Sequence, residues 1–224
     1  METDFTYWPH STPIGVKVEE VFGEVFSSAK LWDEMALQIF CEHGVDSFRE
    51  IGHFPDGAPY ISGLPARISL THTKGLLAVA FLPKTPEADL ALFNPRTSMG
   101  IDAERIDREQ VLKIREKFLS EEELGDIDDK DILKNIIAWT SKEALYKAAL
   151  TPGIDFRNSL KIEKLPVFFR DGDFRKFKEE DYGKALMTDI SGQEGKAFEM
   201  TLFSYESAGC CITIAASVKC AKYH

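Results

Sequence analysis

Several features that would place the chain in a common class of protein are scarce or missing. The 224-residue sequence has four cysteines, Cys41, Cys210, Cys211 and Cys220, and no Cys-x-x-Cys pair, so it predicts neither a zinc site nor a disulfide framework. No apolar run approaches the roughly 18 residues of a transmembrane helix. The segment 1–11 carries acidic residues and no leading cationic region, so we expect no signal peptide. These absences predict a cytoplasmic protein with reduced, buried thiols and no membrane partner.

Positive charge is also in short supply. The chain has 27 Lys and Arg against 37 Asp and Glu, which gives a formal net charge of −10. Nucleic-acid binding needs a dense cationic surface, so we expect no nucleic-acid partner and set aside a metal-dependent nuclease. The segment 105–117 is a local exception, because basic residues gather there with acidic residues between them. Either a docking patch for an acidic partner or a solvated helix of mixed charge explains this segment.

The remaining composition is that of a globular protein, with 44% hydrophobic and 29% charged residues. The length suits one large domain or two small lobes that share an interface. The residue pattern predicts an α+β class with strands and helices in both halves. In the first half we expect a strand within 14–26, a helix over 28–43, and strands over 67–72 and 76–82 joined by a tight turn.

A long connection over residues 83–98, interrupted by prolines, separates two roughly equal halves, and we expect lobes over 1–98 and 99–224. The second half opens with a predicted strand over 99–104. Helices follow: one from about Asp107, which would cap it together with Gln110, a short one capped by Ser120, and a long one over 131–150. Further strands are expected near 165–170, 184–190, 198–205 and 210–218.

Acidic residues and a lysine recur at spacings that suit metal-assisted phosphate chemistry. Asp102 and Glu104 share one face of their predicted strand, because side chains alternate along a strand. Trp139, Glu143 and Lys147 stack along one face of the long predicted helix. Taken alone, these are an ordinary ion pair and a solvated strand face. Mg²⁺, however, prefers carboxylate oxygens together with phosphate oxygens and water, and a packed strand and helix would supply them.

The turn between the predicted strands over 67–72 and 76–82 carries a second set of polar residues. Thr71, His72, Thr73 and Lys74 end one strand and enter the turn. Hydroxyls, an imidazole and turn amides are groups that bind phosphate well. A histidine at a strand end is more often structural, so both interpretations stay open here.

Together these segments resemble the 4'-phosphopantetheinyl transferase superfamily, and most closely its larger, pseudo-dimeric branch. Gly100-Ile101-Asp102-Ala103-Glu104 resembles the family's G-[IV]-D-x-E strand. Residues 139–147 resemble its W-[ST]-x-K-E-[AS]-x-x-K helix, and Thr71-His72-Thr73 resembles its S-H-[ST] turn. Glu123 matches an acid that follows a Phe-x-Ser element, here Phe118-Leu119-Ser120. The spacing agrees from about residue 56 to residue 160.

The resemblance implies two similar α/β lobes related by pseudo-two-fold symmetry, with 1–98 on the nucleotide side of coenzyme A and 99–224 carrying the metal and the catalytic helix. It implies a Mg²⁺-dependent transfer of the 4'-phosphopantetheine arm of coenzyme A to a serine of an apo acyl or peptidyl carrier protein, with release of 3',5'-ADP. The nucleophile then belongs to the carrier, which agrees with the lack of a G-x-S-x-G motif. A monomer suffices when both lobes are in one chain. The alternative is a non-catalytic protein on the same fold that binds coenzyme A or the carrier.

The resemblance also implies roles for particular residues. Asp102, Glu104 and Glu143 would hold Mg²⁺ against the pyrophosphate of coenzyme A. The base that takes the serine proton would be Glu143, or a water that it orients, with Glu123 as the other candidate. Lys147 would stabilise or protonate the departing phosphate oxygen.

The remaining implied roles concern binding of coenzyme A. The groups expected at the 3'-phosphate or the adenosine, and at the pantetheine phosphate, are Thr71, His72, Thr73, Lys74, Lys142 and Arg67. The sequence departs from the family at a Gly-Lys-Pro turn, which here reads Gly57-Ala58-Pro59, and at the start of the first long helix, where Lys30 is followed by acids. This thinned set of cations is the feature that motivates the non-catalytic alternative.

Overall fold

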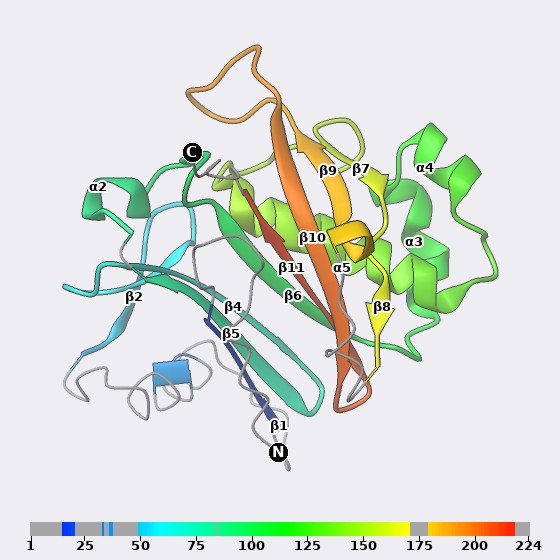
Figure 1. The fold of residues 1–224 in the computed structure, drawn as a ribbon, viewed down its shortest axis with the longest axis horizontal. Coiled ribbons are helices and arrows are strands. Elements are labelled where there is room, and N and C mark those ends of the chain that lie inside the picture. Colours follow the sequence, from blue (N-terminus) through cyan, green and yellow to red (C-terminus); the bar gives the residue numbers. More distant parts are fainter. Residues whose placement is uncertain are drawn as a thin grey trace.

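The computed structural model describes residues 15–20, 33, 36–37, 49–83, 85–170 and 179–217. Its described residues form sheets covered by a few helices, which confirms the mixed α and β composition (Figure 1). The predicted helix over 28–43 lies almost wholly outside the described residues, although positions 33, 36 and 37 are helical. Lys30, Cys41 and Cys220 also lie outside them. None of the helices that are described is long and apolar enough to cross a membrane.

The first sheet has three antiparallel strands in the order β1-β5-β4. The predicted hairpin is confirmed, because β4 and β5 pair in continuous register and reverse direction at Gly75, whose φ of 85° is one that glycine adopts without strain. A short separate hairpin, β2 with β3, precedes it in the chain. The bounds are β1 Gly15–Glu20, β2 Ile51–His53, β3 Pro59–Ile61, β4 Ala66–Thr73 and β5 Leu76–Pro83.

The second sheet runs β6-β11-β10-β9-β7, with the short strand β8 paired in parallel to β10. The strands predicted near 99–104, 184–190, 198–205 and 210–218 are confirmed within a few residues. A strand at Leu160–Lys164 was not predicted. The bounds are β6 Met99–Arg105, β7 Leu160–Lys164, β8 Phe168–Phe169, β9 Gly183–Met187, β10 Phe198–Ser207 and β11 Cys210–Ala216.

The helices begin and end largely where the sequence predicts. Ser120 caps α4 in a reciprocal capping box with Glu123, as expected. The cap predicted at Asp107 is wrong: the helix begins at Gln110 after Glu109, because the Asp107 carboxylate is held by the Arg105 guanidinium at 3.3 Å instead. The bounds are α2 Glu87–Leu90, α3 Gln110–Phe118, α4 Glu121–Asp126, α5 Ile132–Ala149 and a 3₁₀ turn at Glu179–Asp181.

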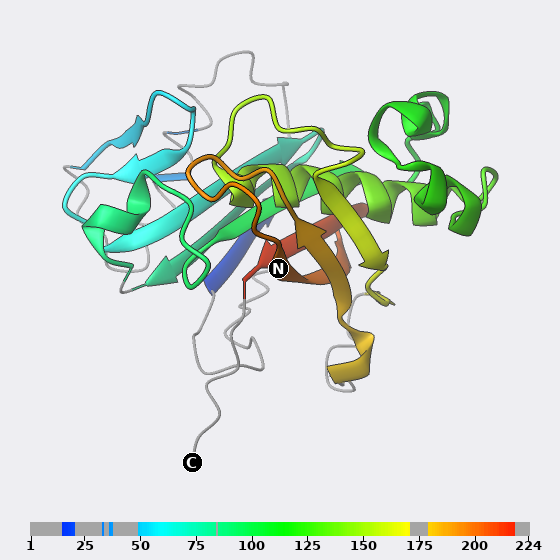
Figure 2. The same cartoon turned by 90° about the horizontal axis from the view of Figure 1, so that it is seen from above.

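The long helix α5 lies across one face of the second sheet, as the view from above shows (Figure 2). Its residues Ile136 and Leu145 pack with Leu202 of β10 in one buried cluster. A second buried cluster forms on the opposite face of that sheet, where Ile101 meets Leu76 of the first sheet. The side chains of β6 therefore alternate as predicted, with Ile101 facing away from α5.

Helix α5 approaches β6 unusually closely, and Gly100 makes this possible. A β-carbon at Gly100 would lie 2.1 Å from the carbonyl oxygen of Ala144 and 2.8 Å from the amide nitrogen of Ala148. Both neighbours are backbone atoms of a helix and cannot move aside cheaply. The glycine therefore sets the depth at which α5 sits and brings its side chains to the level of Asp102 and Glu104.

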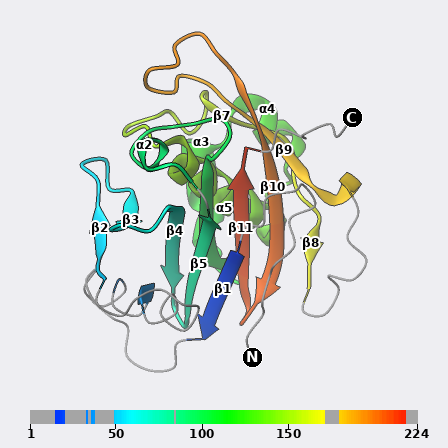
Figure 3. The same ribbon diagram turned by 60° about the vertical axis from the view of Figure 1, so that its left-hand side comes forward.

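The two sheets meet where β4 runs beside β6 (Figure 3). Hydroxyl side chains of β4 make this junction: Ser69 accepts a hydrogen bond from the amide of Ile101 at 3.1 Å, and Thr71 accepts one from the amide of Ala103 at 3.2 Å. Backbone amides of β6 are therefore paired with side-chain hydroxyls of β4, where a continuous sheet would pair them with backbone carbonyl oxygens. The division at residue 98 and the pseudo-two-fold symmetry remain predictions.

Candidate active site

The C-terminal half of α5 faces the acidic end of β6. The Lys147 ammonium donates to Asp102 Oδ1 at 2.7 Å and to the carbonyl oxygen of Ile101 at 2.9 Å. The Lys147 side chain is 28% exposed and that of Asp102 11%, so water screens the pair only in part. The predicted helix spacing has therefore brought a helix lysine onto a strand carboxylate that is 45 residues away in the sequence.

Thr71 and Thr73, which belong to β4 of the first sheet, hold the carboxylates of Asp102 and Glu104 on β6. The Thr71 hydroxyl donates to Asp102 Oδ1 at 3.0 Å, and the Thr73 hydroxyl donates to Glu104 Oε1 at 3.3 Å. Each threonine is thus paired with one acid across the junction of the sheets. Their contact in this structure is with the acids, and not with the cavity described below.

Glu143 lies one helical turn before Lys147 and is partly buried. Its pKa is raised, first by burial and then by the negative charge of Asp102, while Lys147 opposes the shift. The electrostatic coupling places Glu143 within range of both groups. Glu143, Asp102 and Lys147 therefore form one charged cluster between α5 and β6.

Glu104 is held differently from Asp102. Arg108 makes an ion pair with Glu104 Oε2, and the backbone amide of Arg105 donates to Oε1 at 3.0 Å. The Arg108 side chain is 48% exposed and that of Glu104 is 8% exposed, so water screens the pair mainly from the side of the arginine. A strand acid is thus neutralised by a partner that sequence reasoning did not assign to it.

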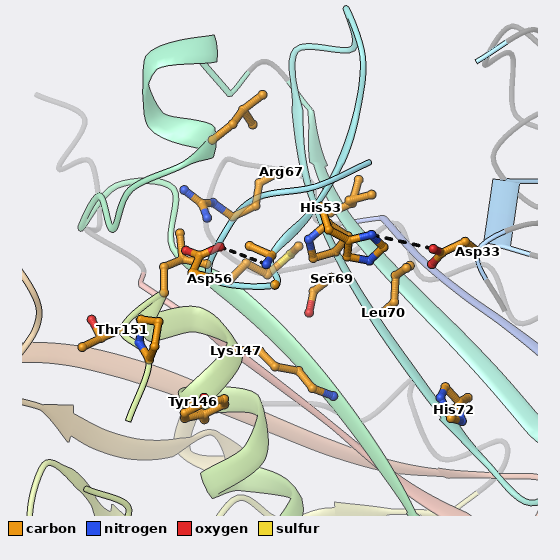
Figure 4. A pocket seen from close by; sticks show the side chains of 18 of the residues that line it. Asp33, His53, Asp56, Arg67, Ser69, Leu70, His72, Tyr146, Lys147 and Thr151 are labelled. Carbon is orange, nitrogen blue, oxygen red and sulfur yellow. Dashed lines mark hydrogen bonds and ion pairs between the residues drawn. The ribbon is translucent and has the colours of Figure 1, made fainter. Parts of the chain in front are cut away.

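A cavity of about 300 Å³ opens beside this cluster, between β4, the turn before β3 and the end of α5 (Figure 4). Lys147 is both on its wall and bonded to Asp102, so it joins the cavity to the acidic cluster. Asp102, Glu104 and Glu143 do not line the cavity themselves. Other groups on the wall include Asp56, Arg67, Ser69, His72 and Tyr146.

His72 and Arg67 both line the cavity, but neither is a strong, exposed cation. Burial lowers the pKa of His72, and the charge of Lys147 lowers it further against the opposing effect of Asp102, so the imidazole is neutral at neutral pH. Arg67 is 4% exposed, and its Nη2 donates to the carbonyl oxygens of Asp89 and Leu92. Burial lowers the Arg67 pKa to about 10, although Asp89 and Asp56 oppose this, and it stays charged at neutral pH.

Lys142 and Glu123 are placed together and away from the cavity. Their ion pair measures 2.8 Å, with side-chain exposures of 0% and 3%. Lys142 also donates to the carbonyl oxygen of Phe156 at 2.9 Å, and Glu123 accepts from the amide of Ile162 at 2.6 Å. Neither group offers surface to a substrate in this arrangement. The roles predicted for Glu123 as a base and for Lys142 as a phosphate contact therefore gain no support from it.

A comparison with known families bears on the assignment. A family model for the 4'-phosphopantetheinyl transferase superfamily matches residues 98–203. Over these residues the chain is similar to that superfamily. The match begins one residue before β6 and includes the whole of α5, so it contains all three predicted metal ligands. No curated protein matches the chain.

Members of the phosphopantetheinyl transferase superfamily act on coenzyme A with Mg²⁺, so the donor set has to be compared with that ion. Two carboxylates, Asp102 and Glu143, interact electrostatically: burial raises the pKa of Glu143 and the negative charge of Asp102 raises it further, so a positive charge between them would relieve their repulsion. Among the described residues, however, no three acidic, His or Cys side chains are gathered closely enough to hold a metal ion. Glu104 is turned to Arg108. The donors suit Mg²⁺ in kind, with the third acid engaged elsewhere.

Several residues of the helix motif of this transferase family have a packing role. Trp139 makes an edge contact with Phe118 of α3 at 5.0 Å between ring centres and stacks on Phe156. The buried Thr140 hydroxyl lies 2.7 Å from that of Thr213 on β11. These contacts fix the rotation of α5, so that Glu143 faces the strand acids. The helical spacing of Trp139, Glu143 and Lys147 was predictable from the sequence, but the packing partners of Trp139 and Thr140 were not.

Proposed function

We propose that this protein transfers the 4'-phosphopantetheine arm of coenzyme A to a serine of an apo acyl or peptidyl carrier protein, with Mg²⁺ and with release of 3',5'-ADP. One observation carries the proposal: Lys147 lies on the wall of a ligand-sized cavity and is bonded to Asp102, beside Glu143. A pyrophosphate bound across that wall would lie between a cation and an acidic pair, as its transfer requires.

Asp102 and Glu143 are the residues that would hold Mg²⁺, and Glu104 would join them once Arg108 releases it. Bound there, the ion would neutralise the pyrophosphate and orient it for in-line attack. Thr71 and Thr73 keep the two strand carboxylates oriented through their hydroxyls. Without substrate, Lys147 neutralises Asp102. If Asp102 were neutralised by Mg²⁺ instead, the Lys147 ammonium would be released and could turn to the leaving phosphate oxygen.

Glu143, directly or through a water, is the group we propose as the base for the carrier serine. Its raised pKa, caused first by burial, makes it a better proton acceptor than an ordinary carboxylate. Glu123 is the weaker candidate, because its oxygens already accept from Lys142 and from the amides of Ser120 and Ile162. Lys147 stabilises the charge that develops on the departing oxygen.

The contacts with coenzyme A are proposed from the cavity wall. His72, neutral at neutral pH, is suited to a hydrogen bond with the nucleotide and not to an ion pair. Lys74 is exposed at the β4–β5 turn, where its charge is available to a phosphate group. Arg67 lines the cavity but is 4% exposed, so we propose that it contributes positive charge to the site and not a direct contact with a phosphate group.

The carrier would dock near the basic residues of the 105–117 segment. Arg115 is not available for this, because it donates to the carbonyl oxygen of Ile127. Lys113 and Lys117 are exposed on α3 and remain candidates. Reversal of both to Glu should raise the KM for an acidic carrier several-fold and leave coenzyme A binding unchanged.

The proposal is tested by incubation of the protein with coenzyme A, MgCl₂ and several apo acyl carrier proteins and peptidyl carrier domains. Intact-mass spectrometry should show carriers that have gained the phosphopantetheine arm. Glu143→Gln should reduce transfer at least a hundred-fold with unchanged circular dichroism. The matched control is Glu199→Gln, which changes an exposed carboxylate on β10 and should transfer normally. The function would be contradicted if Glu143→Gln transferred the arm as well as the wild type does. It would also be contradicted if none of the carriers gained the arm.

The non-catalytic alternative is favoured by one observation. Lys147 and Arg108 neutralise both strand acids, so the acids are stable without a metal. A protein that only binds would then show coenzyme A affinity that does not depend on Mg²⁺. Calorimetric titration of coenzyme A with MgCl₂ and with EDTA separates the two, since metal-dependent binding excludes the alternative.

A further inference from the structure

The turn over residues 56–59 adds a carboxylate to the cavity wall, and two of its amides are already paired. The Gly57 amide donates to the carbonyl oxygen of Phe54 at 2.8 Å, and the Ala58 amide donates to Asp56 Oδ1 at 3.0 Å. Pro59 has no N–H to give. Phosphate sites in turns depend on several amides that point at the anion, and two amides of this turn are already used. The group that the turn adds to the cavity wall is Asp56 itself.

A second carboxylate stands on the same wall. Asp33 lines the cavity, and its Oδ2 lies 3.8 Å from Nδ1 of His53, which also lines it. Burial raises the pKa of Asp33, and a charged His53 would oppose that shift. Negative charge is therefore already disfavoured at this position, and a phosphate group placed beside it would add to the repulsion.

The cations on this wall are turned to other partners. Arg67 donates to two carbonyl oxygens, and its charge is offset by Asp89 and Asp56. Lys147 is bonded to Asp102, and in the close view its ammonium group points away from Asp56 (Figure 4). Among the described lining residues, two aspartates thus balance two permanent cations, and the charge of Arg67 beside the turn is already offset by Asp56.

Carboxylates that line a nucleotide pocket select a ribose hydroxyl over a ribose phosphate. An acid accepts hydrogen bonds from the sugar hydroxyls of NAD, and a cationic residue replaces it where the sugar carries a phosphate. We infer that the Asp56 end of the cavity binds a ribose with a free 3'-hydroxyl, so that 3'-dephospho-coenzyme A is used at least as well as coenzyme A. This inference rests on the transferase function proposed above and names the form of its substrate.

The reaction balances without a further reactant. The carrier serine oxygen forms a bond to the phosphorus that bears the pantetheine arm. The bond between this phosphorus and the bridging oxygen breaks, and the bridging oxygen leaves with its electron pair on 5'-AMP. The serine proton passes to the base. The modified carrier is the same as with coenzyme A, and only the nucleotide product differs.

The test compares the two substrates on one wild-type preparation with MgCl₂ and an apo carrier that accepts the arm. Carrier modification is followed by intact mass, and the released nucleotide is identified as 5'-AMP or 3',5'-ADP by chromatography. We expect a kcat/KM for 3'-dephospho-coenzyme A equal to or above that for coenzyme A. A preference for coenzyme A of threefold or more overturns the inference and leaves the proposed function standing. Transfer from neither substrate overturns both.

A variant assigns the preference to Asp56. Asp56→Asn keeps a side-chain oxygen for the Ala58 amide, so the turn is preserved, and it removes the negative charge. We expect the ratio of kcat/KM for coenzyme A over 3'-dephospho-coenzyme A to rise about five- to tenfold, as for one lost unfavourable charge contact. Glu87→Gln removes an exposed carboxylate of α2 outside the cavity wall and should leave the ratio unchanged. An unchanged ratio in Asp56→Asn would contradict the role of this residue.

Binding without a carrier gives an independent measurement. Calorimetric titration with each nucleotide in MgCl₂ should give a Kd for 3'-dephospho-coenzyme A no weaker than that for coenzyme A. Tighter binding of coenzyme A by threefold or more would contradict the inference even if no carrier were found to accept the arm.

Discussion

The hydroxyl of Thr71 joins the two sheets and holds Asp102 at the same time. It accepts a hydrogen bond from the amide of Ala103 at 3.2 Å and donates one to Asp102 Oδ1 at 3.0 Å. Because a hydroxyl has one proton and two lone pairs, the first contact leaves the proton for the carboxylate. Asp102 is therefore oriented by a threonine from one sheet and by Lys147 from a helix on the other.

Removal of this hydroxyl should affect both stability and the acidic cluster. Thr71→Val keeps the shape of the side chain but leaves the buried Ala103 amide without its partner, and we expect a loss of about 1–3 kcal/mol. Urea denaturation measures it. Thr71→Ser retains the hydroxyl and should recover most of the loss. An equal loss in Thr71→Ser, which keeps the hydroxyl, would contradict a dominant role of the hydrogen bond.

Gly100 should not tolerate a side chain. In Gly100→Ala the new β-carbon would meet the backbone of α5 at Ala144, and relief requires a shift of the whole helix. We expect a loss of about 3 kcal/mol or more in the free energy of unfolding, the upper range for an overpacked core. Thermal and urea unfolding measure it.

The control for this variant is a glycine at which an added β-carbon meets no neighbour. A β-carbon at Gly125, inside α4, meets nothing within 4 Å. Gly125→Ala should therefore stabilise the protein by up to about 1 kcal/mol, because alanine favours a helix more than glycine does. A similar loss in both variants would contradict the close approach of α5 to β6.

The parts of the site that could be predicted from the sequence depend on local periodicity. Alternation along a strand placed Asp102 and Glu104 on one face, and helical spacing placed Glu143 and Lys147 on another. Both elements are long enough or regular enough to fix these faces, and the structure brings the two faces together. The hairpin around Gly75 was predictable for the same reason, since two alternating runs are separated by a glycine turn.

The rest depends on contacts between distant segments, which periodicity does not reveal. Nothing local shows that Lys142 turns inward to meet Glu123, because the two are joined only when α4 and α5 pack. Arg108 reaches Glu104 from the loop before α3, where the sequence suggested only a mixed-charge surface. Asp56 lies in a turn that no local pattern links to a site, and its importance comes from the cavity wall to which it contributes.

Glu143 should lower the stability of the protein at neutral pH. A carboxyl whose pKa is raised in the folded state holds its proton more tightly there than in the unfolded chain, so stability falls as pH rises from the ordinary glutamate value through the raised one. Glu143→Gln removes this effect. Without metal, in EDTA, the variant should be more stable than wild type at pH 7 by about 0.5–2 kcal/mol, a typical cost of a functional site.

The same comparison near pH 4 is its control. Wild-type Glu143 is then mostly protonated in both states, so its penalty is small and the two proteins should differ little. Differential scanning calorimetry at both pH values gives the result. A variant that is less stable than wild type at pH 7 would show that ionised Glu143 is well stabilised, contrary to its raised pKa.

The buried pair of Lys142 and Glu123 should be a structural element of the fold. Lys142→Met leaves the Glu123 charge without its partner at a site with 3% exposure, and we expect a loss of about 3–5 kcal/mol. The double variant Lys142→Met with Glu123→Gln removes both charges and should lose less than Lys142→Met alone. Urea denaturation measures the free energies, and kcat is measured on protein that remains folded. If the pair only supports packing, the double variant retains a kcat within about tenfold of wild type, whereas a catalytic role for either group predicts a loss of a hundred-fold or more.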